Sequence, residues 1–240
     1  MAQVLMPLKD LVKAKTRLAG LLSASQRRAL AQAMAEDLLA MLEEHPAISS
    51  VHLLSDDPSA HLLAARYTAR HWPDVSLPDC DLNTQIRTAV TEILDRSNES
   101  LLIVHADLPL LGPADLDAAL ATQQDTGGLV VGADRHRLGT NLLCFDHSCV
   151  PDFCFGQNSC RRHLASAEAR GFPAKILLRE GIGLDVDEPA DLAELMIALA
   201  PHQPGRTAQL LATQELANRM AVSMPSIAPS SGANRDAGER

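Results

Sequence analysis

The stretch LLIVHADLPLL, residues 101–111, decides the fold of this chain. Its first four residues are apolar without a break, which is typical of a strand buried on both faces of a sheet. We predict a strand over residues 101–105, closely followed by the carboxylate of Asp107. Pro113 opens a predicted helix over residues 113–122, since proline is favoured in the first turn of a helix. A buried strand followed by a helix is the repeating unit of an α/β protein.

Short apolar runs alternate with helical patterns on both sides of this stretch. The further predicted strands cover residues 3–6, 51–55, 128–133, 141–145 and 176–178. The further predicted helices cover residues 23–44, 60–66, 83–95, 159–170 and 189–199. Connections through helices join parallel neighbours, so we predict an α/β fold with a mostly parallel twisted sheet and helices on both faces. Ligands of such sheets bind at the carboxyl ends of the strands.

The length of 240 residues allows one domain and an extension, at roughly 150 residues per domain. A hydrophobic fraction of 46% and a charged fraction of 21% are typical of a soluble globular protein. We place the domain at residues 1–200 and a C-terminal extension at residues 201–240. Residues 201–222 could still form a peripheral helix around Leu210, Leu211 and Leu216. The extension is expected to be mostly disordered after residue 224, because the run PSIAPSSG that follows cannot supply a core.

Charge and composition exclude several classes of partner. A formal net charge of −9 gives no general attraction for nucleic acid or an anionic membrane, and an aromatic content of 2% argues against a platform for stacking bases. No apolar run approaches the ~18 residues of a membrane-spanning helix. The cysteines lack CxxC spacing, which favours reduced thiols in the cytoplasm over a zinc site. They are Cys80, Cys144, Cys149, Cys154 and Cys160.

A cluster of cations follows the first predicted strand. Its members are Lys9, Lys13, Lys15 and Arg17. At the carboxyl end of a strand in an acidic protein, such a cluster suits a polyphosphate, since lysine supplies a point charge and arginine a forked pair of donors. A solvated basic loop without a ligand is the alternative.

Three carboxylates are candidate metal ligands. Asp107 lies at the carboxyl end of a buried strand, where a loop or helix-capping aspartate is the alternative. Asp185 and Asp187 alternate along an extended segment, so their side chains are expected on the same side. Like charges in that arrangement favour a cation between them, and hard oxygen ligands suit Mg²⁺. Helix capping by Asp187 is the alternative for that residue.

A second candidate anion site combines GTN, residues 139–141, with FGQNS, residues 155–159. Gly156 allows a ligand to approach the backbone closely. Ser159 opens a predicted helix whose free N–H groups attract an anion, although an ordinary serine cap is the alternative. Two anion sites that flank a metal suit a nucleoside triphosphate together with a small phosphorylated acceptor.

The chain resembles the CofC-type guanylyltransferases of coenzyme F420 biosynthesis over residues 3–199. The matching motifs, in order, are PLK (7–9), AKTRL (14–18), LN (82–83), ADLPL (106–110), GTN (139–141), FGQNS (155–159) with His163, and LDVDEPADL (184–192). The resemblance implies a nucleotidyltransferase-like, Rossmann-type fold and a homodimer. It implies transfer of GMP from GTP to a small phosphorylated three-carbon acid, with release of pyrophosphate. Of the acids that the family uses, overall likeness favours 3-phospho-D-glycerate over 2-phospho-L-lactate and phosphoenolpyruvate.

The resemblance also assigns roles to residues of this chain. Asp107, Asp185 and Asp187 would hold Mg²⁺. Asp107, Lys15 and Arg17 would carry the catalysis, the last two on the GTP phosphates. The further implied substrate-binding residues are Thr140, Gly156 and Ser159 at the acceptor phosphate, Asn83 near the nucleoside, and Lys9 of the basic cluster.

Several alternatives stay open. His163 could donate to the carboxylate of the acceptor or be a packed histidine. The family usually has glycine before the Leu-Asn pair, where this chain has Asp81, so the conformation of that loop is open. A nucleotidyltransferase for another phosphorylated acceptor, or a catalytically silent nucleotide-binding protein on the same fold, would share most of these features.

Overall fold

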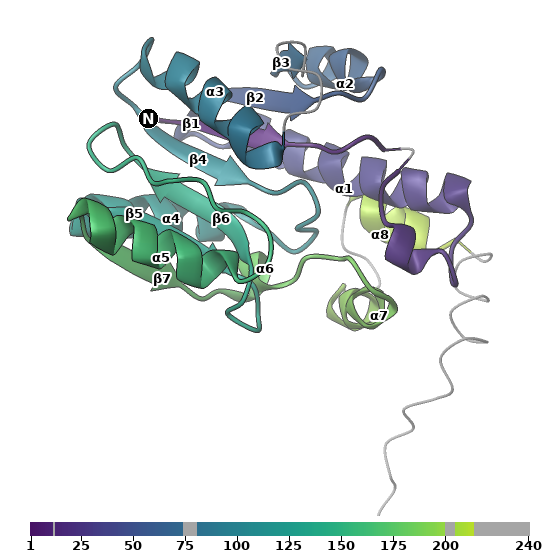
Figure 1. The fold of residues 1–240 in the computed structure, drawn as a ribbon. Coiled ribbons are helices and arrows are strands. Elements are labelled where there is room, and N and C mark those ends of the chain that lie inside the picture. The colour runs from purple at the N-terminus through teal and green to yellow at the C-terminus, as the bar shows by residue number, and fades with distance from the viewer. Residues whose placement is uncertain (12, 74–80, 200–204, 214–240) are drawn as a thin grey trace, which may run out of the picture.

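The computed structural model describes residues 1–11, 13–73, 81–199 and 205–213, and they form a sheet with helices on both faces (Figure 1). The strand order is β3-β2-β1-β4-β6-β5-β7. The strands are β1 (Ala2–Pro7), β2 (Ile48–Ser55), β3 (Arg70–Pro73), β4 (Ser100–Val104), β5 (Leu129–Ala133), β6 (Thr140–Phe145) and β7 (Ala174–Leu177). β6 runs antiparallel to β4 and β5, and the other paired strands are parallel. The predicted mostly parallel sheet is confirmed.

The reversed direction of β6 matters for the site. It brings the amino end of β6, at Thr140, to the edge where the neighbouring strands have their carboxyl ends. The turn over residues 134–139 joins β5 to β6. Its shape is held by the Asp134 carboxylate, which accepts from the backbone N–H groups of Leu138 at 2.8 Å and Gly139 at 2.9 Å.

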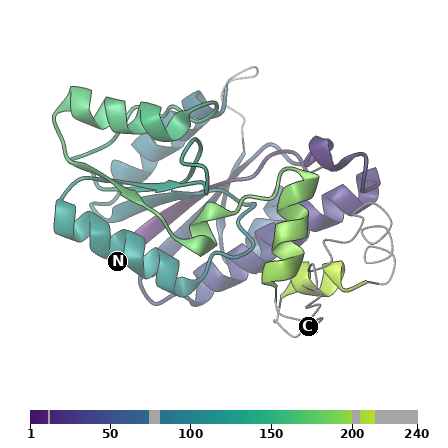
Figure 2. The same ribbon diagram turned by 90° about the horizontal axis from the view of Figure 1, so that it is seen from below.

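The helices divide between the two faces of the sheet. They are η1 (Thr16–Leu18, a short 3-10 helix), α1 (Ala24–Glu44), α2 (Ala60–Arg66), α3 (Leu82–Leu94), α4 (Pro113–Thr126), α5 (Ser159–Arg170), α6 (Glu180–Gly183), α7 (Pro189–Ala198) and α8 (Arg206–Leu211). α1, α2 and α4 pack on one face, whereas α3 and α5 pack on the other. α7 and α8 lie together beside α1 (Figure 2).

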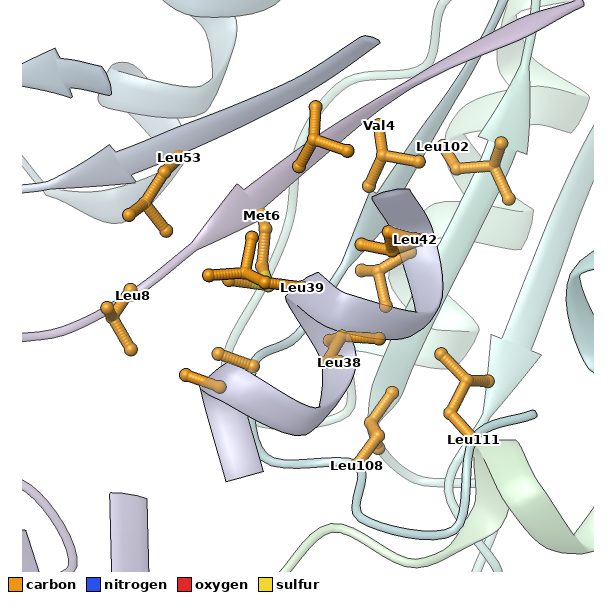
Figure 3. Close-up of a cluster of buried hydrophobic side chains, with 14 of the residues drawn as sticks. Val4, Met6, Leu8, Leu38, Leu39, Leu42, Leu53, Leu102, Leu108 and Leu111 are labelled. Atoms are coloured by element: carbon orange, nitrogen blue, oxygen red, sulfur yellow. The ribbon is translucent and has the colours of Figure 1, made fainter. Parts of the chain in front are cut away.

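Alternation along β1 supplies both hydrophobic cores. Val4 and Met6 are fully buried beneath α1, where Leu39 and its neighbours cover them (Figure 3). Leu5 points to the opposite face and packs with Ile86 of α3. Since both faces of this strand are covered, it reads as an almost continuous apolar run in the sequence.

A third hydrophobic cluster connects the segments that will form the site. It joins the loop after β1, the amino half of α1, the chain after α6, and helices α7 and α8. Its buried members are Leu18, Leu22, Leu30, Met34, Leu184, Val186, Leu192, Leu195 and Leu211. Because Leu18 and Val186 lie in one cluster, the loop that carries Lys15 is fixed relative to the segment that carries Asp185 and Asp187.

Helix α8 is anchored to α1 through Asp37. The Asp37 carboxylate accepts from the backbone N–H groups of Arg206 at 2.7 Å and Thr207 at 2.8 Å. The boundary expected at residue 200, the expected disorder after residue 224 and Cys80 lie outside the described residues. Over the described ranges, the structure contains no helix with the length and apolar character needed to cross a membrane.

Most predicted elements are confirmed, two of them with the predicted bounds. These two are α2 and α5. α1 begins directly after Ser23, whose hydroxyl accepts from the N–H of Gln26 at 3.3 Å while the Gln26 side chain accepts from the N–H of Ser23 at 2.9 Å. α4 continues past residue 122 to Thr126 and ends at Gly127, which has the left-handed φ of 58° that glycine tolerates.

Three short elements were not predicted: β3, η1 and α6. β3 has the sequence RHWP, which offers no alternating apolar pattern, and it is defined only by its pairing with β2 at the edge of the sheet. Helix capping by Asp187 is wrong. Glu188 is the N-cap of α7, and the Asp191 carboxylate accepts from the N–H groups of Asp187 at 2.9 Å and Glu188 at 2.6 Å.

Candidate functional site

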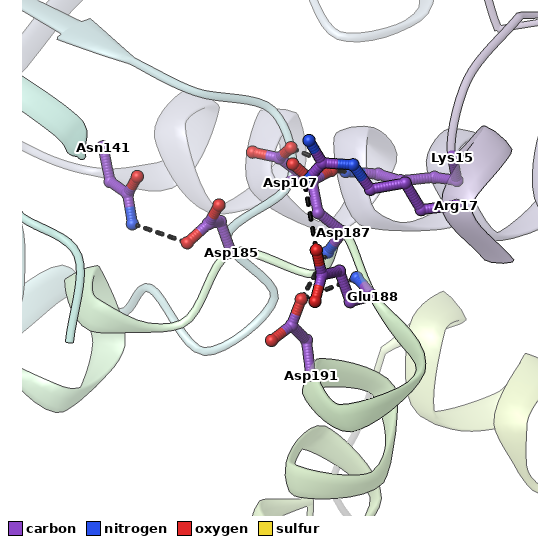
Figure 4. Close-up of polar contacts among 8 residues, drawn as sticks. All are labelled: Lys15, Arg17, Asp107, Asn141, Asp185, Asp187, Glu188 and Asp191. Atoms are coloured by element: carbon purple, nitrogen blue, oxygen red, sulfur yellow. Dashed lines mark hydrogen bonds and ion pairs between the residues drawn. The ribbon is translucent and has the colours of Figure 1, made fainter. Parts of the chain in front are cut away.

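Lys15 lies at the centre of a cluster drawn from three distant parts of the sequence. Its Nζ is 2.6 Å from Oδ2 of Asp107 and 2.8 Å from Oδ1 of Asp187 (Figure 4). Only 7% of the Lys15 side chain is exposed. The backbone of Val186 donates to the carbonyl of Asp107 at 3.2 Å, which ties together the two segments that carry the carboxylates.

The backbone at Lys15 is strained. Its φ of 55° and ψ of 40° lie in the left-handed region, which costs a residue with a Cβ roughly 1–2 kcal/mol. The strain turns the chain from the loop after β1 into η1, where Leu18 is fully buried. The ion pairs with two carboxylates offset the cost and hold the ammonium at the edge of the sheet.

The cluster shifts the pKa values of its members in a consistent way. Burial opposes the charge of Lys15, but Asp107 and Asp187 outweigh it and raise the pKa of Lys15 above its ordinary value. Burial also acts against the charge of Asp107, yet Lys15 holds the pKa of Asp107 below its usual range. At Asp185, burial and the nearby charge of Asp107 together raise the pKa.

Asp185 belongs to a different contact. Its Oδ1 accepts from Nδ2 of Asn141 at 3.2 Å, and the same amide nitrogen donates to the carbonyl of Ile182 at 2.8 Å (Figure 4). In the part of the chain that the structure describes, no three or more histidine, cysteine, aspartate or glutamate side chains are gathered closely enough to hold a metal ion. The ammonium of Lys15 instead lies between two of the expected ligands.

The donor set nevertheless fits a hard divalent cation. Oδ1 of Asp107 is buried and has no hydrogen-bond partner among the described residues, which is costly for a carboxylate oxygen unless a ligand completes it. Asp107 and Asp187 already converge on a positive charge, and Asp185 adds a third oxygen donor nearby. Carboxylate oxygens are the ligands that Mg²⁺ prefers.

A pocket of about 540 Å³ opens beside this cluster. It lies between the loop after β1, the carboxyl ends of β2 and β4, and the start of α3. The charged side chains of its lining are Lys9, Lys13, Lys15 and Arg17, and the carboxylates Asp10, Asp56, Asp107 and Asp187. The expected cation cluster therefore surrounds one pocket, although the Arg17 guanidinium lies 3.2 Å from the Glu188 carboxylate at an exposed position.

Asn83, for which the resemblance implies a place near the nucleoside, contacts the FGQNS turn. Its side chain pairs with the backbone of Phe155: Nδ2 donates to the carbonyl at 3.2 Å, and Oδ1 accepts from the N–H at 2.7 Å. Asn83 thus holds the start of the FGQNS turn. Asp81 is the N-cap of α3, and its carboxylate accepts from the N–H of Thr84 at 3.0 Å, which accounts for an aspartate at this position.

The residues expected at the acceptor phosphate are connected through helix α5 and the turn before it. Thr140 Oγ1 lies 3.0 Å from Nδ1 of His163, and both residues are buried. Gly156 is exposed and has a φ of 117°, which favours glycine, and its carbonyl accepts from the N–H of buried Ser159 at 3.1 Å. His163 is therefore the packed histidine of the two alternatives.

Two features of the site were missed by sequence reasoning. Arg135 pairs with Asp191 and lies 3.5 Å from Glu194, so its guanidinium is held against α7. Asp191 in turn accepts from the backbone of Asp187. The spacing of a Glu-Pro-Ala-Asp helix start was the available signal, because an acidic residue at the third helical position often caps the backbone before it.

Comparisons with known proteins agree with this architecture. A family model described as "Guanylyl transferase CofC like" matches residues 2–209. The chain is 36% identical over 204 residues to the phosphoenolpyruvate guanylyltransferase of Conexibacter woesei, covering 84% of this chain and 90% of that one. It is 36% identical over 200 residues to the phosphoenolpyruvate guanylyltransferase of Sphaerobacter thermophilus, covering 82% and 92%.

Solved structures share the fold at low sequence identity. A protein of Desulfovibrio desulfuricans G20, assigned to the nucleotide-diphospho-sugar transferases, superimposes with a TM-score of 0.73 at 16% identity, covering 91% of this chain and 97% of that one. A 4-diphosphocytidyl-2C-methyl-D-erythritol synthase gives a TM-score of 0.54 at 13% identity, covering 83% and 98%. The nucleotidyltransferase-like fold expected from the sequence is confirmed.

Proposed function

The chain belongs to the CofC-like guanylyl transferase family, and we propose on this basis that it transfers GMP from GTP to the phosphate of a small phosphorylated three-carbon acid, with release of pyrophosphate, in coenzyme F420 biosynthesis. Membership of the family makes it a nucleotidyltransferase. The observation that supports the finer proposal is the position of the Lys15, Asp107 and Asp187 cluster. Its three residues line one pocket together with the cationic side chains of Lys9, Lys13 and Arg17.

Phosphoenolpyruvate is the acceptor that we propose to test first. The sequence alone favoured 3-phospho-D-glycerate, and that preference has gained no support. Two relatives at 36% identity are named for phosphoenolpyruvate instead. The candidate acids all present one phosphate and one carboxylate, so the anion-binding groups named above suit each of them.

The proposed reaction requires no general base. A phosphate monoester has a second pKa of about 6, so the acceptor phosphate is largely a dianion at neutral pH and can attack the α-phosphorus of GTP directly. The task of the protein is to hold several negative charges together and in line. Lys9, Lys15 and Arg17 would bind the triphosphate from the pocket side.

We propose that Asp107, Asp185 and Asp187 would hold Mg²⁺. When bound, the ion would neutralise charge on the phosphoryl groups of the substrates. The chain's own contribution is to position these carboxylates: Asp187 through the cap of α7, Asp185 through Asn141, and Asp107 at the end of β4.

On the acceptor side, Thr140, Gly156 and Ser159 would bind the phosphate of the acid. Thr140 offers a hydroxyl, and the amino end of α5, where Ser159 lies, carries the positive end of the helix dipole, which suits an anion. A cytoplasmic homodimer stays a proposal, which light scattering of the purified protein and fractionation of cells would test.

The decisive experiment is a pyrophosphate-release assay with the full chain, Mg²⁺, GTP and each of the three acids in turn. We expect release with GTP and at least one acid, and a product whose mass equals the acid plus GMP minus water. Parallel reactions with a sugar phosphate test the first rival, a different acceptor. No release with any acid or sugar phosphate would favour the second rival, a silent nucleotide-binding protein.

A further inference from the structure

His163 makes two hydrogen bonds beneath the FGQNS turn. Its ring is fully buried on α5. Nε2 accepts from the backbone N–H of Cys154 at 2.9 Å, and Nδ1 lies 3.0 Å from Oγ1 of Thr140. The ring also meets the Phe155 ring edge-on, with the centroids 4.9 Å apart.

These two contacts determine where the imidazole proton lies. A backbone N–H can only donate, so Nε2 must be the unprotonated nitrogen of the ring. A neutral imidazole then carries its proton on Nδ1. Burial, with help from the nearby charges of Arg162 and His105, lowers the pKa of His163 to about 4, so the ring is neutral at physiological pH.

The direction of the second hydrogen bond follows. With its proton on Nδ1, His163 donates to Thr140, and Oγ1 of Thr140 accepts. The hydroxyl proton of Thr140 is then left to donate elsewhere, because one hydroxyl carries one proton. A hydroxyl whose proton is not used by His163 can donate that proton to an anion such as a phosphate.

The same ring also fixes the backbone of the turn. His163 holds the N–H of Cys154, and Asn83 holds both backbone groups of Phe155 from the opposite helix, α3. The main chain that leads into Gly156 is thus fixed from two sides by neutral side chains. Neutral partners carry no charge that would have to be displaced when an anion arrives.

We infer that His163 is a positioning residue for the acceptor: it donates to Thr140 through Nδ1, so that the Thr140 hydroxyl donates to the acceptor phosphate, and it holds Cys154 so that Gly156 and Ser159 face the same anion. This inference rests on the proposed function for the identity of the anion. The assignment of the proton on His163 does not.

The tests use variants of the full chain. H163Q keeps both contacts, since the side-chain carbonyl of glutamine can accept from Cys154 and its NH₂ group can donate to Thr140. H163L removes both. We expect H163L and T140V each to raise KM for the acceptor, and its Kd by calorimetry, by about tenfold, as expected for loss of a hydrogen bond to a charged group. The KM for GTP should change by less than about twofold.

Two comparisons separate positioning from a merely structural role. H163Q should restore acceptor KM to within about threefold of wild type, and the double variant H163L/T140V should be no worse than either single variant, because the two residues act as a unit. The matched control is H52L. His52 is also buried with both ring nitrogens hydrogen-bonded, but it lies against Gln3 and Trp72, and its loss should leave acceptor KM unchanged.

A direct readout is the ¹⁵N spectrum of the His163 ring at neutral pH, with H163Q used to assign the signal. A proton on Nδ1 is expected, and a proton on Nε2 would overturn the inference. An H163Q variant as impaired as H163L, or equal losses in KM for GTP and acceptor, would overturn it as well. If wild type transfers GMP to none of the acids, the proposed function fails. In that case, calorimetry with each acid tests the role of His163 without the reaction. If T140V or H163L binds the acids with the same Kd as wild type, the inference is overturned.

Discussion

The two sides of the candidate site are held together by different physics. On the side proposed for the nucleotide, a buried ammonium is shared between the carboxylates of Asp107 and Asp187 at 2.6 and 2.8 Å. On the side proposed for the acceptor, Thr140 contacts His163, and His163 and Asn83 hold the backbone of Cys154 and Phe155. Charges that are paired internally must exchange partners when a charged substrate binds, whereas a neutral network can stay as it is.

Because of this difference, substitutions on the two sides should reduce stability for different reasons. A buried ion pair is strongly destabilised when one partner is removed, because the other charge is left without compensation. A neutral network loses the hydrogen bonds of the altered residue, about 1 kcal/mol each when the partner regains water and more when it stays buried. Substitutions on the nucleotide side should therefore alter charge balance and chemistry, and those on the acceptor side should alter position.

The largest effect is expected from Asp107→Asn. The amide keeps the shape but removes a charge that faces Lys15, so turnover should fall by about a hundredfold to a thousandfold, as when one key electrostatic group is lost. The measurement is pyrophosphate release at saturating substrates, with folding checked by circular dichroism. Asp125→Asn removes an exposed charge on α4 and should change nothing. Substantial GMP transfer by Asp107→Asn would remove this residue from its role.

Acid should affect the neutral network before the charged one. Burial, together with nearby arginines, lowers the pKa of His52 and of His163 to about 4, against 6.5 in the unfolded chain. The unfolded state therefore binds more protons as the pH falls from 6.5 toward 4. Stability that is fully present above pH 6.5 is lost across that window, at up to roughly 3 kcal/mol for each histidine.

Urea unfolding at pH 7.5, 5.5 and 4.5 measures this dependence. In the H52L variant, the free energy of unfolding should depend less on pH, because the part of the loss that comes from His52 is removed. A free energy of unfolding that is flat between pH 7 and 4.5 would show that neither ring resists protonation.

Lys15→Met tests whether the ammonium competes with a metal ion. Removing a unit charge at contact distance is worth up to about 4 kcal/mol at an effective dielectric constant of 20, so affinity for Mn²⁺ without nucleotide should rise by at least about tenfold. Turnover should fall at the same time. Electron paramagnetic resonance counts free Mn²⁺ during a titration. Arg17→Met, at an exposed ion pair, serves as the control, and equal Mn²⁺ affinity in wild type and Lys15→Met would contradict the competition.

Asn83→Ala distinguishes the two placements of this residue. If it holds the backbone of Phe155, the KM for the acceptor should rise by about fivefold and the melting temperature should fall, since a buried N–H loses its partner. If it lies at the nucleoside, the KM for GTP should rise instead. Thr88→Ala, exposed on the same helix, is the matched control.

The smallest effect is expected from Glu188→Gln. Its ion pair with Arg17 is exposed on both sides, with 58% and 68% of the side chains accessible, and such pairs contribute less than about 1 kcal/mol. Turnover should stay within about twofold of wild type and the free energy of unfolding within about 0.5 kcal/mol. A loss comparable to that of Asp107→Asn would mean that the buried cluster extends farther than its distances indicate.

The sequence predicted the sheet and most helices because their patterns are local. The apolar run before Asp107 and the capping pair of Ser23 and Gln26 need no distant partner to be recognised. β3 escaped notice because its strand character comes only from pairing with β2. The same limit applies to η1, since an unusual φ at Lys15 leaves no mark on residue composition.

The contacts among the clustered charged residues could not be predicted from the sequence, although their proximity could. Motif order brought Lys15, Asp107 and Asp187 to one edge of the sheet. It could not show that the ammonium lies between the carboxylates, because that depends on the packing of Leu18 and Val186 in a shared cluster. The pairing of Asn83 with a backbone 72 positions away is equally nonlocal.

The length of the turn over residues 134–139 determines which face of the sheet Thr140 points to, so odd and even changes in that length should have different effects. Successive side chains of a strand point to opposite faces, so a single residue inserted into or deleted from this turn would shift the register of β6 and direct Thr140 away from His163. A change of two residues would return it to the same face. Even and odd length variants of this turn should therefore differ sharply, and tolerance of insertions here should alternate rather than decline steadily.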